Sequence, residues 1–261
     1  MNAHRNLQGS NISQGKSSEK LSSGYKINRA ADDAAGLSIS EKMRTQIRSL
    51  NQAQSNVQDG VSLVQTAEGA MNEVSDMLTR MKELAVKASN GTYNASDLGA
   101  IDAEYKALSS AIDNVATKTN FNGINLLDTA ANSSVAIQMG DKINDEIKIN
   151  LTNITTGSLQ IDATIGTAAA AKTAMAKIDT AIGKVNTARS DFGAVQNQLE
   201  HTFNNLGATT ENLQAAESRV RDTDMAKEMM NYTKLNILQQ ASTSMLAQAN
   251  QAPQGVLQLI R

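Results

Sequence analysis

The sequence predicts a mainly α-helical protein: a long antiparallel coiled-coil helical bundle, or rod, closed by its N- and C-terminal halves, with a small β-hairpin region in the middle. Three observations predict this fold. Only 3% of the 261 residues are aromatic, so aliphatic side chains and methionine must fill the core. The single proline, Pro253, leaves the 252 preceding residues without the strongest helix breaker. Apolar residues recur at steps of three and four along much of the chain.

The first long helix is predicted from Met43 to Ala85, where this spacing persists for about six heptads. A second apolar series lies one position before the main one, at Leu63, Ala70, Met77 and Leu84. This second series has two interpretations. It either widens the helix face toward a third helix of the same bundle, or it stays exposed on the monomer and packs against other subunits.

A turn and a shorter helix follow the first long helix. Residues 90–94 (NGTYN) have turn composition, and either Asn94 or Ser96 can cap a new helix that carries Asp97 in its first turn. The apolar spacing continues this helix to about Thr117. We therefore expect an antiparallel helical hairpin.

The period changes to two between residue 120 and about residue 167, which predicts a small β-hairpin around the turn-like segment 140–145. The alternating apolar positions are Val135, Ile137, Met139, Ile147, Ile149 and Leu151. From Ala168 to about Val220 the helical period returns, so a second long helix can lie along the first.

The two chain ends are predicted to depend on partners. The segment 225–261 has many large apolar residues, but their burial returns less free energy than ordering the segment costs. The segment up to Gly24 is richer in Ser, Asn, Gln and Gly, so it is even less able to hold structure by itself. Both ends are therefore expected to be disordered in the monomer and helical inside an assembly.

Composition and motifs argue against catalytic, cofactor-binding and metal sites and against binding of nucleic acid or membranes. The net charge of −2 gives no general attraction to nucleic acid or to an anionic membrane, and the chain has no cysteine. The two histidines, His4 and His201, belong to no zinc-binding motif, and no phosphate-binding loop is present. The adjacent Asp32 and Asp33 are expected to be solvated or to cap a helix. We expect no catalytic, cofactor-binding or metal site, and an enzyme in the middle segment is disfavoured.

Two long motifs carry a resemblance to a known family. Residues 21–40 (LSSGYKINRAADDAAGLSIS) closely resemble the N-terminal signature of bacterial flagellins, and residues 218–226 (SRVRDTDMA) and 237–251 resemble the C-terminal signature. The resemblance implies a self-assembling filament subunit, extracellular on the bacterial flagellum and exported without a cleavable signal peptide. It implies a homopolymer, with an export chaperone and a cap protein as partners. The alternative within the family is a hook–filament junction protein.

The resemblance also implies a domain layout. The inner domain comprises residues 1–36 and 216–261, and the rod domain comprises 37–215, divided into N-terminal helices (37–118), a β-hairpin or irregular middle (119–167) and a C-terminal helix (168–215). From the resemblance we also expect that large outer domains are absent, because the middle is short. We further expect that the N-terminus is shortened, because flagellins carry more residues before the segment that resembles 2–7. The expected assembly residues are Leu21, Ile27, Leu37, Leu235, Ile237, Leu238, Met245, Leu246, Leu257, Leu259 and Ile260.

Flagellins are also ligands of Toll-like receptor 5, and residues 79–86 (TRMKELAV) look like the segment that the receptor binds. The resemblance assigns this role to Arg80, Glu83, Leu84 and Glu104. Leu84 lies off the main apolar series one turn after Arg80, so we expect an exposed leucine beside an arginine. An ordinary contact between subunits is the alternative.

Overall fold

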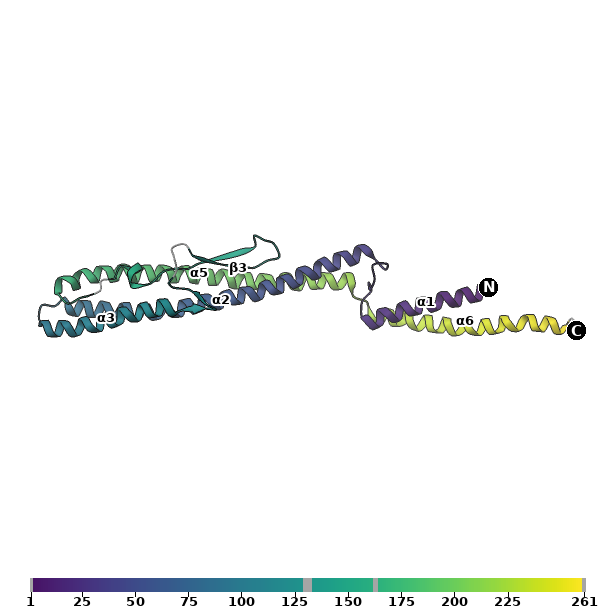
Figure 1. Cartoon of the computed structure of the whole chain (residues 1–261). Coiled ribbons are helices and arrows are strands. Elements are labelled where there is room, and N and C mark those ends of the chain that lie inside the picture. The colour runs from purple at the N-terminus through teal and green to yellow at the C-terminus, as the bar shows by residue number, and fades with distance from the viewer. Residues whose placement is uncertain (1, 129–132, 162–163, 260–261) are drawn as a thin grey trace. The chain divides into compact units, whose positions relative to one another are not determined.

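The computed structural model describes residues 2–128, 133–161 and 164–259, and side chains only between residues 4 and 249 of these ranges (Figure 1). This part of the chain is mainly helical, as predicted. In chain order its elements are α1 (Asn2–Ser23), α2 (Ala34–Ala88), α3 (Ala95–Lys118), β1 (Asn120–Phe121), β2 (Ile124–Asn125), β3 (Ser134–Gln138), β4 (Glu146–Asn150), α4 (Thr156–Leu159), α5 (Ala168–Arg221) and α6 (Met225–Leu259).

The chain forms two compact units, and each unit combines segments from both halves of the sequence. The terminal unit comprises Met1–Arg48 and Thr210–Arg261, and the central unit comprises Ser49–Thr209. The boundaries fall inside α2 and α5, so each of these two helices contributes to both units. The closure of the fold by sequence-distant halves is therefore as predicted.

Helices α2 and α5 are antiparallel in the central unit. Near one end of the pair, Lys82 of α2 donates a hydrogen bond to Asp179 of α5. Near the other end, the side chain of Gln54 lies 3.5 Å from the position that a Cβ of Gly207 would occupy. Between these two contacts the residue number falls by 28 along α2 and rises by 28 along α5. The two helices therefore run in opposite directions with the same number of residues between the contacts.

The helix α3 begins at a complete capping box. The side chain of Asn94 accepts a hydrogen bond from the backbone N–H of Asp97 at 2.8 Å, and the Asp97 carboxylate accepts one from the backbone N–H of Asn94. This arrangement satisfies two N–H groups that a helix start otherwise leaves without partners. Of the two residues that the sequence offered, Asn94 is the cap.

The predicted hairpin is present as the antiparallel pair of β3 and β4. Val135 pairs with Ile149 and Ile137 with Ile147, and the side chains of Ile147 and Ile149 are buried. Ile137 lies over α2, where a Cβ on Gly60 would come within 3.2 Å of its side chain. A second, very small hairpin, β1 with β2, was not predicted. Its turn residues Asn122 and Gly123 have φ of 51° and 81°, the left-handed conformation that an Asn-Gly turn favours.

Candidate assembly surface

Helices α1 and α6 lie side by side in the terminal unit, with both chain ends at the same end of the pair (Figure 1). Ser17 of α1, which is buried, donates a hydrogen bond to the Glu228 carboxylate of α6 at 2.5 Å. Half-buried side chains recur on α6 at Tyr232, Leu235 and Leu246. These positions follow Glu228 at helical spacing, which indicates the α6 face turned toward α1.

The terminal unit has almost no hydrophobic core of its own. Among the described side chains, 35 hydrophobic residues are buried, and 34 of them lie in the central unit. The one in the terminal unit is Ile27, in the segment between α1 and α2. The stability that apolar burial provides is therefore concentrated in the central unit.

Nine of the described large apolar side chains of the terminal unit are exposed instead. Those of Ile12, Tyr25, Ile39, Met225, Met229, Met230, Ile237, Leu238 and Met245 are between 37% and 67% exposed. Six of these nine belong to α6. A face with this composition on a single protein chain marks a surface for contact with another macromolecule.

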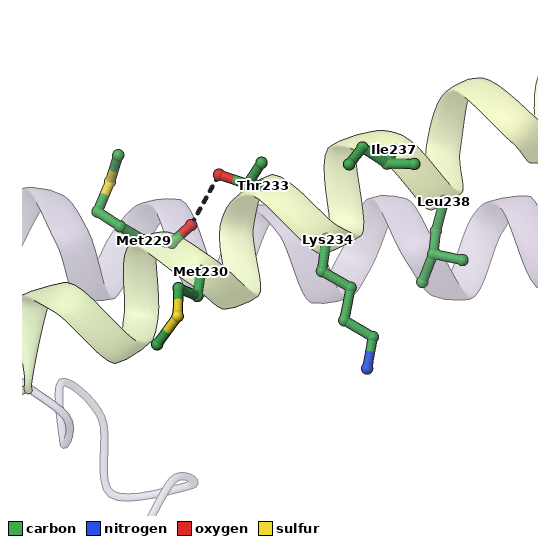
Figure 2. Close-up of a pocket in the computed structure, with 6 residues that line it drawn as sticks. All are labelled: Met229, Met230, Thr233, Lys234, Ile237 and Leu238. Carbon is green, nitrogen blue, oxygen red and sulfur yellow. Dashed lines mark hydrogen bonds between the residues drawn. The ribbon is translucent and has the colours of Figure 1, made fainter.

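A shallow apolar groove lies on this exposed face of α6 and is lined by that helix alone. Figure 2 shows its two rows of side chains, each with a spacing of four residues. One row is Met229, Thr233 and Ile237, and the other is Met230, Lys234 and Leu238. The Thr233 hydroxyl is satisfied within the helix, where it donates to the carbonyl of Met229 at 2.9 Å. Thr233 therefore needs no partner, and Lys234 is the only charged group in the groove.

The predicted assembly residues have three different environments. Ile237, Leu238 and Met245 are 61%, 43% and 66% exposed on α6. Leu21, Leu37, Leu235 and Leu246 are half-buried, whereas Ile27 is buried inside the subunit. The side chains of Leu257 and Leu259, and Ile260 as a whole, lie outside the described residues.

Sequence reasoning did not select Met225, Met229 or Met230 for assembly, although they are exposed beside the selected residues. The available signal was their spacing: Met225 and Met229 lie one helical turn apart and lead through Thr233 to Ile237.

The Asp32-Asp33 pair shapes the segment between α1 and α2. Asp32 accepts hydrogen bonds from the backbone N–H groups of Arg29 and Asn28, and the bond from Arg29 holds its pKa below the usual range. Asp33 caps α2 by accepting from the backbone N–H of Gly36 at 2.9 Å. A Cβ at Gly36 would collide with this carboxylate and with Ile27, so a larger residue there would displace both side chains. Of the pair, Asp33 therefore has the predicted capping role, and Asp32 accepts hydrogen bonds from the turn before it.

Three of the four predicted receptor-binding residues form one charged cluster in the central unit. Arg80 of α2 donates to Glu104 of α3 at 2.8 Å and to Glu83 at 2.9 Å, and all three side chains are about half exposed. The hydrogen bonds to Glu104 and then Glu83 raise the pKa of Arg80.

The expectation of an exposed Leu84 is wrong, because this side chain is only 3% exposed. Leu63, in the same second apolar series, is also 3% exposed, while Ala70 and Met77 are half-buried. The series therefore belongs to a wide face of α2 that is covered within the bundle, and Leu84 is a core residue rather than a surface anchor.

The described residues contain no group of three potential metal ligands from His, Cys, Asp and Glu. Over the same ranges, no helix is both long and apolar enough to cross a membrane. What the terminal unit does offer is a long apolar helix face without a core beneath it.

Comparison with known families decides the identity of the chain. Residues 1–132 match the bacterial flagellin N-terminal helical region, and residues 175–260 match the bacterial flagellin C-terminal helical region. The chain belongs to the bacterial flagellins. Flagellins are structural subunits of the flagellar filament and not enzymes.

Curated relatives agree with this assignment over the full length. The flagellin of Halalkalibacterium halodurans is 52% identical over 265 residues, a match that covers 100% of this chain and 97% of the relative. The flagellin of Bacillus subtilis is 48% identical with the same coverage. The flagellar filament 33 kDa core protein of Treponema phagedenis is 44% identical, again over 100% of this chain and 97% of its own.

Solved structures agree at the level of the fold. The crystal structure of Bacillus cereus flagellin is 38% identical with a TM-score of 0.55, over 62% of this chain and 94% of that one. A putative flagellar hook-associated protein from Vibrio parahaemolyticus has a TM-score of 0.63 over 73% of this chain and 100% of its own. At 15% identity the second likeness concerns the fold alone.

Proposed function

We propose that this flagellin polymerises through the exposed apolar faces of α1 and α6. The observation that carries the proposal is the contrast between the units: among the described side chains, the terminal unit buries one hydrophobic residue, whereas the central unit buries 34. The same terminal unit exposes Ile12 on α1 and six large apolar side chains on α6. Contact between copies removes this surface from water and supplies the missing core.

Assembly and ordering of the ends are coupled in this proposal. The terminal helices bury too little apolar surface inside one subunit to offset the entropy of ordering them. Helical α1 and α6 are then the conformation that subunit contacts select, and dilute monomer has disordered ends. Limited proteolysis of dilute monomer should cleave residues 2–23 and 225–259 well before the central unit.

An aspartate in the groove tests the contact surface. Ile237 is 61% exposed in the subunit, so Ile237→Asp should leave monomer stability nearly unchanged. In a filament it would bury an unpaired carboxylate, which we expect to raise the critical concentration for polymerisation about tenfold or more. The measurement is the monomer concentration that remains in equilibrium with sedimented filaments.

A matched control separates the surface from the added charge. Ile143, at the tip of the β3–β4 turn in the central unit, is 94% exposed, and Ile143→Asp should change the critical concentration far less. Polymerisation of Ile237→Asp at the wild-type critical concentration would refute the proposed surface. Sedimentation of wild-type protein into long filaments also favours a filament subunit over a hook–filament junction protein, which occurs in few copies.

The further partners that the resemblance implies belong to the same proposal. We propose that the subunit is exported to the cell exterior with an export chaperone and adds to the filament under a cap protein. The exposed apolar face of α6 supports the need for a chaperone, because that face would otherwise promote aggregation before assembly.

A second candidate function is recognition of the monomer by Toll-like receptor 5. It is supported by the cluster of Arg80, Glu83 and Glu104. Two carboxylates hold the arginine in a fixed position, Glu83 from the same helix, α2, and Glu104 from α3. An arginine fixed in this way loses little entropy on binding. Leu84 enters this proposal only as a buried core residue of the same helix.

The receptor proposal is tested by binding of purified receptor ectodomain to monomer. Arg80→Ala should weaken binding about fivefold or more, the loss typical of an interface hot spot. Lys82→Ala is the control, because Lys82 lies two residues away and pairs with Asp179 of α5. Equal affinity of Arg80→Ala and wild type would exclude the cluster from the receptor surface.

A further inference from the structure

The two segments that join the terminal helices to α2 and α5 are hydrogen-bonded to each other. The backbone N–H of Lys26 donates to the carbonyl of Arg221 at 2.7 Å, and the N–H of Thr223 donates to the carbonyl of Gly24 at 2.9 Å. Together these bonds form an isolated antiparallel bridge between Tyr25 and Asp222. The segment that follows α1 and the segment that precedes α6 are thus hydrogen-bonded to each other, next to the C-terminal end of α1 and the N-terminal end of α6.

Three side chains lie together at this bridge, where Arg221 contacts both Tyr25 and Glu41. The guanidinium of Arg221 lies over the ring of Tyr25, 4.8 Å from its centroid. It also donates a hydrogen bond to the Glu41 carboxylate of α2 at 2.6 Å. Arg221 is only 12% exposed although Glu41 is 53% exposed, so the cation is enclosed while its partner reaches it from the surface. An enclosed cation is stabilised only while its aromatic and carboxylate partners stay in place.

This enclosure is specific to one of two neighbouring arginines. Arg219 lies in the same last turn of α5 but is exposed. Glu41 is also contacted by Arg44, at 3.1 Å, one turn along α2. Through Arg221 and Arg44, in that order, the pKa of Glu41 is lowered, as expected for a carboxylate that serves as a persistent hydrogen-bond acceptor.

We propose that Arg221, Tyr25 and Glu41 form a clasp that ends the ordered part of the free subunit and holds the C-terminal end of α1 next to the N-terminal end of α6. Arg221 is then a positioning residue for assembly. Both terminal chains leave the folded subunit from one tied point, so they enter a filament as a pair rather than independently. The consequence for polymerisation rests on the assembly role proposed for α1 and α6, whereas the clasp itself is a property of the monomer.

The clasp needs no assembly to be tested. In backbone hydrogen exchange on dilute wild-type monomer, the amides of Lys26 and Thr223 should exchange at least about tenfold more slowly than unstructured amides. Both belong to hydrogen bonds of the bridge, and they lie on opposite sides of it. Wild-type amides that exchange at unstructured rates would overturn the proposal, whatever the filaments do.

Substitutions then identify the side chains responsible. Arg221→Ala and Glu41→Ala should each raise the exchange rates of both amides about tenfold, and the double variant should raise them little further, because both remove one interaction. Arg219→Ala is the matched control and should leave both rates unchanged, as should Tyr25→Phe, which keeps the ring. Additive effects of Arg221→Ala and Glu41→Ala, or an equal effect of Arg219→Ala, would overturn the clasp.

Two further measurements are made on the same variants: the exchange protection of the central unit and the rate of filament elongation. Amides in the central segments of α2 and α5 should keep their protection in every variant, which shows that the central unit stays folded. Filament elongation by Arg221→Ala should be several-fold slower than by wild type at equal monomer concentration. If Ile237→Asp polymerises normally while the clasp amides behave as expected, the proposed groove fails and the clasp stands.

Discussion

The carboxylate of Asp102 on α3 accepts a hydrogen bond from the backbone N–H of Ile165 at 2.6 Å and so joins α3 to the segment that leads into α5. The same carboxylate accepts from the Thr164 hydroxyl and from Lys106, each at 2.7 Å, and Asp102 is 9% exposed. Burial alone would raise the pKa of this carboxyl. The three donors, Lys106 first, outweigh burial, so the pKa of Asp102 lies below its ordinary value.

Asp102→Asn should destabilise the central unit by about 1–3 kcal/mol at pH 7, because the charge-assisted hydrogen bonds weaken and a buried amide replaces a carboxylate. The folded-state pKa is depressed. The stabilising contribution is therefore complete above the ordinary aspartate pKa of about 3.9 and is lost as pH falls through the lower folded value. Urea unfolding at pH 7 and pH 3 measures this, and the difference between variant and wild type should shrink at pH 3.

Asp59 supplies the comparison for this prediction. It is exposed on α2, so Asp59→Asn should shift the urea midpoint little at either pH. A difference between Asp102→Asn and wild type that is as large at pH 3 as at pH 7 would contradict the assigned ionisation.

Sequence periodicity predicted the helices and the hairpin because it reports which residues share one face of an element. The three-four spacing from Met43 to Ala85 indicated α2, and strict alternation indicated β3 and β4. The first turns of α2, from Ala34, were not predicted from periodicity, because the helix begins at the cap Asp33 and not at an apolar repeat.

Periodicity does not report which neighbour covers a face. Leu84 was expected on the surface because it lies off the main series, yet the bundle covers it. The contact of Arg221 with Glu41 was not predicted either, because it joins residues 180 positions apart and no local pattern encodes such a pair. The exposed apolar residues of α6 were predicted in part: Ile237, Leu238 and Met245 were selected, whereas Met225, Met229 and Met230 were not.

Leu84→Ala should act on stability. Its side chain is 3% exposed, so truncation leaves a cavity, and we expect the free energy of unfolding of the central unit to fall by about 2–5 kcal/mol. Chemical denaturation measures this loss directly. Val86→Ala, at a position 48% exposed on the same helix, should cost much less. Equal denaturation midpoints for Leu84→Ala and wild type would mean that Leu84 is not a core residue.

The choice between Asn94 and Ser96 as the helix cap is open to a simple test. Asn94→Ala removes the acceptor for the Asp97 amide and should destabilise the central unit by about 0.5–2 kcal/mol. Ser96 lies two residues further on, inside the first turn of α3, so Ser96→Ala should have little effect or slightly favour the helix. Thermal unfolding followed by circular dichroism compares the two variants, and the reverse order of their effects would reassign the cap.

The β3–β4 hairpin lies close to α2 at Gly60. A Cβ at this position would lie 3.2 Å from Cγ1 of Ile137 and 3.5 Å from Cδ1 of Leu199. Gly60→Val adds two further methyl groups to this contact, so β3 or α5 must move away, and we expect a loss of about 1–3 kcal/mol in the free energy of unfolding.

Gly69 lies on the same helix, but nothing comes within 4 Å of a Cβ placed there. Gly69→Ala should therefore show only the helix propensity gain, a stabilisation of up to about 1 kcal/mol. Urea midpoints of both variants decide the matter, because opposite signs on one helix can only come from what covers each glycine. If Gly60→Val is as stable as wild type, the hairpin does not lie against α2 at this level, and the burial of Ile147 and Ile149 needs another explanation.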